Sequence, residues 1–262
     1  MTKTPRSRLG ITLCTVALAL LVVDDSGLSA TGPVLSLSVE GAPVPALRVA
    51  GYPGLVTNAV YPRVFRPGFQ LEAVNQGLRT AVVAEEQRFA RFLRSYEPRV
   101  PKLDRQTLHG GFETSLKPSL LSASTVVVSA LIPDTECVPG CTGADFWFSV
   151  TVRVPSGDVI TLPRLFANRR SGLRALANFA ERQVLASNRC IRPYFEPTGF
   201  TPTWKNYQSF ALTASGIAVG FGTSQVGLPG CGRVSTIVPY SVIAPYFSGL
   251  GKQLVAGVRA AT

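Results

Sequence analysis

The chain has 262 residues, of which 46% are hydrophobic and only 16% are charged. This composition excludes an intrinsically disordered protein and is enough for one core, or for one core with a small lobe. Lysine and arginine outnumber aspartate and glutamate by 26 to 15, so the formal net charge is +11.

The first residues have the pattern of a secretory signal peptide, which we assign to residues 1–30. Lys3, Arg6 and Arg8 precede the apolar segment 9–23, and Ala30 offers a small residue for cleavage. The apolar segment is short for a bilayer span, which needs roughly 20 residues. We therefore expect a secreted or extracytoplasmic protein with no stable membrane span after leader cleavage, although an uncleaved anchor is the alternative.

The charge that remains after the leader indicates the kind of partner. Residues 1–30 hold three basic and two acidic side chains, so the rest of the chain keeps a net charge of +10. In an exported protein this favours an extracellular protein or an anionic cell-envelope polymer over nucleic acid, although the charge can also serve solubility alone.

Residues 31–60 are rich in Gly, Pro, Val and Leu without a helical period, which predicts an extended N-terminal arm with a strand near residues 34–39. A long helix is predicted over residues 69–96, because apolar residues recur there at a spacing of three to four. The arginines of this helix fall away from that stripe. They form either a binding face or, in the simpler interpretation, a solvated face.

The remaining elements alternate in a way typical of an α+β fold. A second helix is predicted over residues 171–187, with Ser171 as its N-cap. The sequence thus predicts an antiparallel sheet packed by two main helices, in a domain over residues 61–250 followed by a C-terminal tail, residues 251–262. Strands are predicted at 112–116, 120–132, 146–154, 210–212, 217–221 and 235–238, with a helical turn near Ser241.

Four cysteines remain after the leader, which in an exported chain suggests two disulfides. They are Cys137, Cys141, Cys190 and Cys231. Three pairings are possible, and we favour Cys137–Cys141 with Cys190–Cys231. Four thiolates could instead hold zinc, but no Cys-x-x-Cys pair exists and the expected compartment is oxidising, so we expect no metal and no cofactor.

Two kinds of catalytic site were considered. His109, the only histidine, begins a His-Gly-Gly string like an esterase oxyanion loop, but the Gly-x-Ser-x-Gly elbow that such enzymes need is missing. Asp134, Glu136 and Asp145 flank the cysteine loop and could hydrolyse envelope glycans or esters. Acidic residues beside a surface loop are more often simply solvated, so the sequence favours a protein that is not an enzyme.

The loop at residues 188–205 is the stronger binding candidate, because aromatic and basic side chains are interleaved there. Such composition is typical of interface hot spots, and loops on rigid scaffolds often bind partners. The alternative is a small hydrophobic cluster packed under a long loop. The candidate binding residues are Arg192, Tyr194, Phe195, Phe200, Trp204 and Lys205.

Four short motifs occur in a recognisable order. They are Tyr61-Pro62 before the helix that carries Asn75, and the segments 156–166, 206–213 and 238–243. Over residues 61–246 this set resembles the extracytoplasmic domain of unknown function in RsiV-type anti-sigma factors. The same domain ends certain peptidoglycan deacetylases and makes up much of the mycobacterial secreted immunogenic protein MPT family. Phe166 and Phe210 within these motifs are expected to be core anchors.

The chain departs from the family pattern before the strand at 146–154. The family often has a Gly-Gly-x-His segment there, whereas this chain has the cysteine loop 137–143 without a histidine. What the resemblance implies is a secreted, non-enzymatic binding protein of the cell envelope or extracellular space. A lysozyme-like protein is one candidate partner, because RsiV-type domains bind lysozyme. Deacetylation in the relatives belongs to a separate domain.

Overall fold

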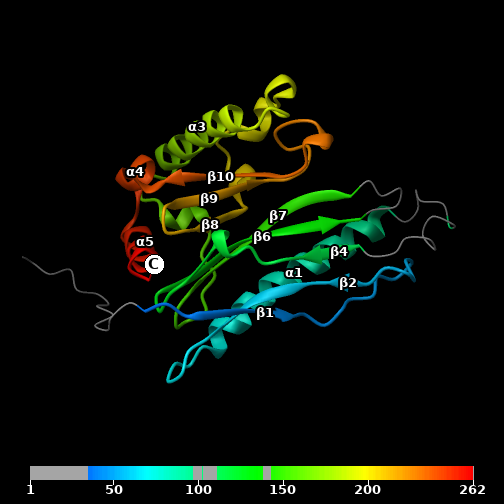
Figure 1. The fold of residues 1–262 in the computed structure, drawn as a ribbon, viewed down its shortest axis with the longest axis horizontal. Coiled ribbons are helices and arrows are strands. Elements are labelled where there is room, and N and C mark those ends of the chain that lie inside the picture. Colours follow the sequence, from blue (N-terminus) through cyan, green and yellow to red (C-terminus); the bar gives the residue numbers. More distant parts are fainter. Residues whose placement is uncertain (1–34, 97–101, 103–110, 138–142, 262) are drawn as a thin grey trace, which may run out of the picture. The chain divides into compact units, whose positions relative to one another are not determined.

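The computed structural model describes residues 35–96, 102, 111–137 and 143–261, so the predicted leader lies outside the described residues. From Leu35 onward, the described residues belong to one compact unit (Figure 1). Its strands are β1 (Ser38–Pro43), β2 (Thr57–Asn58), β3 (Val60–Phe65), β4 (Phe112–Thr114), β5 (Leu121–Ala123), β6 (Val127–Glu136), β7 (Ala144–Arg153), β8 (Phe210–Leu212), β9 (Gly216–Phe221) and β10 (Val234–Pro239). Its α-helices are α1 (Glu72–Tyr96), α3 (Arg169–Ser187), α4 (Tyr240–Ile243) and α5 (Gly249–Ala260).

The strands β6 and β7 form the antiparallel hairpin around which both halves of the unit are built. Their register runs from Val127 opposite Arg153 to Glu136 opposite Ala144. β4 and β5 pair with the other edge of β6, and β2 runs parallel to β4. Because side chains alternate along a strand, this hairpin has two faces of different composition.

One face of the hairpin is covered by α1 and by the N-terminal segment. Val74, Leu78 and Phe89 of α1 are fully buried in this core. β1 pairs with β3, and Tyr52 and Leu55 from the segment between β1 and β2 are buried in the same core. The residues expected as an extended arm therefore add both a strand and core side chains. The hairpin contributes Val128, Ala130, Ile132, Phe148, Val150 and Val152.

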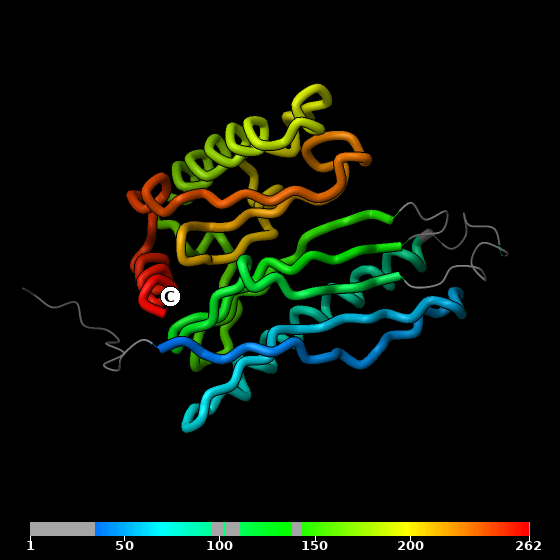
Figure 2. The backbone as a smooth tube through the Cα atoms, in the orientation of Figure 1, coloured from blue at the N-terminus to red at the C-terminus, as the bar shows by residue number. Residues whose placement is uncertain are grey.

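The other face carries a second core, formed around the sheet β8–β9–β10, with α3 packed against β10 (Figures 1 and 2). Phe166 and Phe210 are buried in it, as the sequence predicts. Residues 251–260, expected as a tail, lie in α5, which places Leu254 and Val258 in the same core. The chain is thus an α+β protein, which confirms the predicted class.

Hydroxyl groups of the sheet that contains β5, β6 and β7 bond to β8, which is an edge strand of the sheet β8–β9–β10. The N–H of Leu212 donates to Ser129 Oγ at 2.8 Å, and the Ser122 hydroxyl donates to Leu212 O at 2.5 Å. Shortly before β8 in the chain, the carbonyl oxygen of Gln208 accepts a hydrogen bond from Ser149 Oγ at 2.9 Å. Buried backbone groups need such partners, so these hydroxyls take the place of a neighbouring strand.

Two local predictions were wrong. Residues 120–132, predicted as one strand, contain β5 and β6, which pair with each other after a tight turn at Ser124. The Ser124 hydroxyl accepts hydrogen bonds from Val126 N and Val127 N, and a side chain that competes in this way for backbone donors favours a turn. The N-cap of α3 is Asn168, whose side chain accepts from Ser171 N at 3.1 Å, so Ser171 lies inside the helix.

Candidate functional site

A pocket of about 380 Å³ lies where two of the family-like segments, 156–166 and 206–213, meet the outer face of β7. Its size is within the range of small-molecule and side-chain pockets. Val159 lies on its exposed side and is 52% exposed. The pocket is lined by Ser149, Thr151, Val159, Ile160, Thr161, Leu162, Pro163, Trp204, Tyr207, Gln208 and Phe210.

Local sequence explains how this pocket is built. The period of two along β7 places Ser149 and Thr151 on the face away from α1, while Phe148 and Val150 face that helix. The short 3-10 helix Trp204–Tyr207 supplies the opposite wall. Tyr207 is held by a hydrogen bond from its hydroxyl to Phe200 O at 2.9 Å. Burial raises the pKa of Tyr207, so this phenol stays neutral.

The described residues that line the pocket carry no carboxylate, imidazole, amine or guanidinium. Ser149 is their most exposed hydroxyl on β7, and its proton goes to the Gln208 carbonyl oxygen. A nucleophilic serine needs an adjacent base, and this lining offers none. The pocket can therefore hold a ligand through apolar surface, hydroxyls and one amide, but it lacks groups for acid–base chemistry.

The predicted binding residues of the loop 188–205 do not form one surface. Trp204 lines the pocket and lies 6.2 Å from the Phe166 ring, and Lys205 beside it is exposed. Phe200 is buried, with its ring 4.9 Å from that of Phe221.

The other three lie on or near the short 3-10 helix Arg192–Tyr194. The Arg192 guanidinium donates to Leu185 O and Ala186 O at the end of α3, at 3.1 and 3.2 Å. Phe195 stacks on Phe200 with their ring centroids 5.7 Å apart. Tyr194 is 57% exposed. Only Trp204 among the six lines the pocket, and only Tyr194 presents a largely exposed ring.

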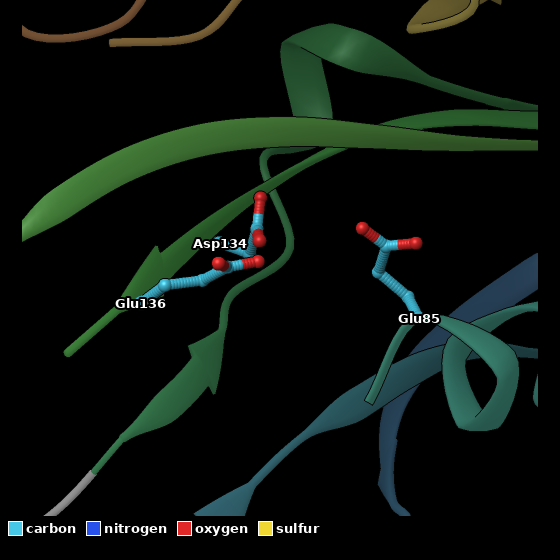
Figure 3. Close-up of side chains that lie close together, drawn as sticks. All are labelled: Glu85, Asp134 and Glu136. Carbon is cyan, nitrogen blue, oxygen red and sulfur yellow. The ribbon is translucent and has the colours of Figure 1, made fainter. Parts of the chain in front are cut away.

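The acidic residues near the cysteine loop are divided between the two faces of the hairpin. Asp134 and Glu136 occupy alternate positions of β6, so both face α1, where they meet Glu85 (Figure 3). Asp145 belongs to the opposite face and is bonded to Thr135 Oγ1 at 2.9 Å and to Arg233 Nη1 at 3.1 Å. The predicted trio is thus a pair plus one separate, ion-paired residue.

Glu85 and Arg88 of α1 complete the group around Asp134 and Glu136. Arg88 Nε donates to Glu85 Oε1 at 2.6 Å, and Arg88 Nη2 donates to Glu136 Oε1. Sequence reasoning did not include Glu85. The sequence does show Glu85 three residues before Arg88 on the long helix, a spacing at which the two side chains can pair. That spacing does not show which strand the pair faces.

Asp134 is the most unusual member of this group, because it is only 1% exposed. Within the described part of the chain, no donor reaches either of its carboxylate oxygens. Burial, together with the neighbouring carboxylates of Glu136 and Glu85, raises the pKa of Asp134 to about 8 against the opposing effect of Arg88 and Arg233. The pKa of Glu136 is also raised, mainly by burial.

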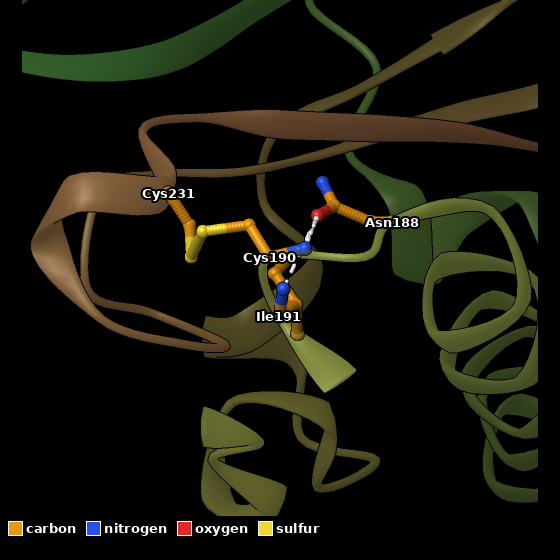
Figure 4. Close-up of a disulfide and its surroundings, with 4 residues drawn as sticks. All are labelled: Asn188, Cys190, Ile191 and Cys231. Atoms are coloured by element: carbon orange, nitrogen blue, oxygen red, sulfur yellow. Dashed lines mark hydrogen bonds between the residues drawn. A yellow bond between two sulfur atoms is a disulfide. The ribbon is translucent and has the colours of Figure 1, made fainter. Parts of the chain in front are cut away.

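The cysteine pairing that the sequence favours is confirmed in part. Cys190 and Cys231 form a disulfide that links the loop after α3 to the connection between β9 and β10 (Figure 4). Asn188 shapes the first side of this link, since its Oδ1 accepts from Cys190 N at 3.0 Å and from Ile191 N at 3.2 Å. Cys137 is also a disulfide cysteine. Its predicted partner, Cys141, lies outside the described residues.

No protein-family model matches the chain, and no curated protein matches it either. Among solved structures, the chain resembles a DUF3298 family member from Bacteroides fragilis, with a TM-score of 0.54 and 12% identity over 86% of this chain and 98% of the other. A DUF3298 protein from Pseudomonas aeruginosa PAO1 gives a TM-score of 0.44 and 11% identity over 83% of this chain and 95% of the other.

The first of these likenesses shows a shared fold. The chain therefore has the fold of a domain of unknown function, which agrees with the coarser part of the sequence-based resemblance. The finer link to RsiV-type and MPT proteins stays a prediction. Among the described residues, every helix is too short or too polar to cross a bilayer.

Proposed function

We propose that the protein is a secreted, non-enzymatic binding protein of the cell envelope or extracellular space, and that it receives its partner at the Trp204 pocket. The observation that carries the proposal is the chemistry of the pocket. It is uncharged, it is partly rimmed by exposed Val159, and it contains no acid–base pair. Apolar pockets with a few fixed polar groups are suited to recognition rather than to turnover.

A protein partner is the form of this proposal that the pocket supports best. An aromatic or aliphatic side chain anchored on Trp204 would bury apolar area, and Gln208 and Thr161 would offer polar contacts beside it. The sequence resemblance to RsiV-type domains makes a lysozyme-like protein one concrete candidate. An anionic envelope polymer is less well matched to this pocket, because the pocket itself carries no positive charge.

The alternative function, a hydrolase of envelope glycans or esters, has less support. Glycosidase carboxylates stand about 5 to 9.5 Å apart across a site that a sugar can enter. Asp134 and Glu136 are 1% and 3% exposed and lie against each other, and Asp145 is paired with Arg233 on the other face. None of the three offers an open acid next to an open base.

The test is binding of the purified, oxidised protein to lysozyme and to fractionated secreted proteins, with and without Val159→Asp. A charge at this exposed rim position should leave the fold intact and weaken specific binding by roughly tenfold or more, the cost of losing one hot-spot contact. The matched control is Leu228→Asp, since Leu228 is also an exposed apolar residue, at 46%, but does not line the pocket.

Three outcomes are informative. Binding that survives high salt and is lost with Val159→Asp alone supports the proposal. Equal loss in both variants, or capture seen only at low salt, contradicts it and indicates charge-driven association. Turnover of envelope glycans or esters that disappears with Glu136→Gln would replace it with the hydrolase.

A further inference from the structure

Three carboxylates from two elements that are distant in sequence converge between α1 and β6. One oxygen from each of Glu85, Asp134 and Glu136 lies within 4.8 Å of the other two (Figure 3). Oxygens bound to one Ca²⁺ at 2.3–2.6 Å can stand at most about 5 Å apart. The three side chains therefore already have the spacing of ligands in a single coordination sphere.

The charges of this group do not balance on their own. When ionised, the three carboxylates carry three negative charges, and Arg88, bonded to Glu85 and Glu136, supplies one positive charge. Arg233 donates to the backbone carbonyl of Asp134 at 2.9 Å, but its ion pair is with Asp145 on the other face. A divalent cation would supply the two missing positive charges, and like charges held this close are otherwise unfavourable.

Asp134 provides a second observation that points to a ligand. Its side chain is buried and directed into the group, and no donor within the described part of the chain reaches either carboxylate oxygen. A buried ionised carboxylate without partners is strongly disfavoured, and it normally either pairs, coordinates a metal or binds a proton. Arg88 donates to Glu85 and Glu136, and its guanidinium donates no hydrogen bond to Asp134.

We propose that Glu85, Asp134 and Glu136 form a calcium-type divalent cation site that fastens α1 to β6. The ligands are all carboxylate oxygens, which hard cations prefer, whereas zinc and copper favour nitrogen and sulfur. Mg²⁺ usually keeps several of its waters and takes one or two carboxylates. Three carboxylates around a buried aspartate suit Ca²⁺ better, because it accepts many protein oxygens in flexible geometry.

The competing explanation is a proton shared between Asp134 and Glu136, whose side chains are close enough to hydrogen-bond when one is protonated. Thermal unfolding distinguishes the two. The purified, oxidised protein is stripped with EDTA at mildly alkaline pH and then melted with CaCl₂, with MgCl₂, and with NaCl of matched ionic strength. A cation at a hundredfold excess over Kd should raise the Tm by about 5 to 10 °C.

The key variant is Asp134→Asn, which should abolish both the Ca²⁺-dependent rise in Tm and the calorimetric heat of Ca²⁺ binding. Asp145→Asn is the matched control, since Asp145 lies in the paired strand on the opposite face, and it should keep both. If Asp134→Asn fails to fold, Glu85→Gln takes its place with the same expectation. Arg88→Met should increase Ca²⁺ affinity several-fold, because it removes a competing positive charge.

A rise in Tm with CaCl₂ alone, lost with Asp134→Asn, supports the site. A Tm in CaCl₂ equal to that in EDTA or in matched NaCl overturns it and leaves the shared proton as the explanation. A response to MgCl₂ as strong as that to CaCl₂ overturns the assignment to calcium. Partner binding at the Trp204 pocket enters none of these measurements, so this inference fails or stands independently of the proposed function.

Discussion

Glu86 follows Glu85 on α1 but turns toward the N-terminal segment, where its carboxylate accepts a hydrogen bond from Thr57 Oγ1. The residue is 2% exposed, and burial raises its pKa against the opposing effect of that hydrogen bond. In the folded protein the charged form is thus disfavoured relative to the unfolded chain. Between the ordinary and the raised pKa, the folded state binds more protons than the unfolded state.

The contribution of Glu86 to the free energy of unfolding falls as pH rises from the ordinary pKa of a glutamate through its raised value. The Glu86→Gln variant has no charge to bury, so its free energy of unfolding should change less over this pH range. Its stability relative to wild type should therefore be greatest at alkaline pH. Urea unfolding in EDTA at several pH values measures it, with exposed Glu113→Gln as the control.

If wild type and Glu86→Gln lose stability in parallel as pH rises, Glu86 is not the source of the pH dependence of the free energy of unfolding. The amide can still accept the Thr57 bond, so the comparison isolates charge from packing.

At the scale of elements, the turn after β7, at the start of the family-like segment 156–166, is fitted closely to α1. Gly157 has φ +78°, and a Cβ there would lie 2.5 Å from the carbonyl oxygen of Ala73 in the first turn of the helix. Gly68, in the turn before α1, has nearly the same φ of +79°, but nothing lies within 4 Å of a Cβ built there. The two positions share the backbone conformation and differ in the space around it.

This pair gives a matched prediction. Gly68→Ala should cost about 1 to 2 kcal/mol for the left-handed backbone alone. Gly157→Ala should cost more, about 2 to 4 kcal/mol, because the helix or the turn must also shift. Equilibrium urea denaturation of both variants measures the difference. Equal losses would mean that the contact with Ala73 relaxes freely and that the turn does not position α1.

Elements whose signal is local could be predicted from the sequence. The apolar spacing within residues 69–96 predicted α1, and residues 146–154 were predicted as a strand, which corresponds to β7. The break between β5 and β6 could not be predicted, because Ser124 and its neighbours have strand-like composition while the Ser124 side chain makes the turn.

The candidate sites were less accessible to sequence reasoning, because each depends on contacts between distant segments. Trp204 was identified from the composition of the loop 188–205, but the rest of its pocket is formed by β7 and the segment after it, which the loop sequence does not reveal. Asp134 and Glu136 were found through their position near the cysteines, whereas Glu85 enters only through the packing of α1 on the sheet. Asp145, which lies in the paired strand β7, was grouped with them by proximity in sequence but lies on the opposite face.

At the scale of the molecule, the β6–β7 hairpin separates the two candidate sites. The pocket uses Ser149 and Thr151 on one face, and the carboxylates of Asp134 and Glu136 lie on the other. The face toward α1 belongs to one hydrophobic core, whereas Leu131 and Trp147 on the other face pack in a separate cluster with Ala211 and Ala218. Sites without shared side chains are expected to behave independently.

A double variant tests this independence. The changes in free energy of unfolding for Val159→Asp and Asp134→Asn should add to within about 0.5 kcal/mol in Val159→Asp/Asp134→Asn. Urea denaturation of the four proteins gives the comparison. A coupling well above that value would show that the hairpin transmits strain from one face to the other.

The hydroxyl bonds at β8 have a consequence for how the protein can meet another chain. An edge strand normally offers unpaired N–H and C=O groups on which a foreign strand can grow, by sheet extension or by aggregation. At β8 the N–H and C=O of Leu212 are held by Ser129 and Ser122, and the carbonyl of Gln208 just before it is held by Ser149. These three groups are therefore not free to pair with a foreign strand, so a partner that meets the protein beside them must be recognised through side chains.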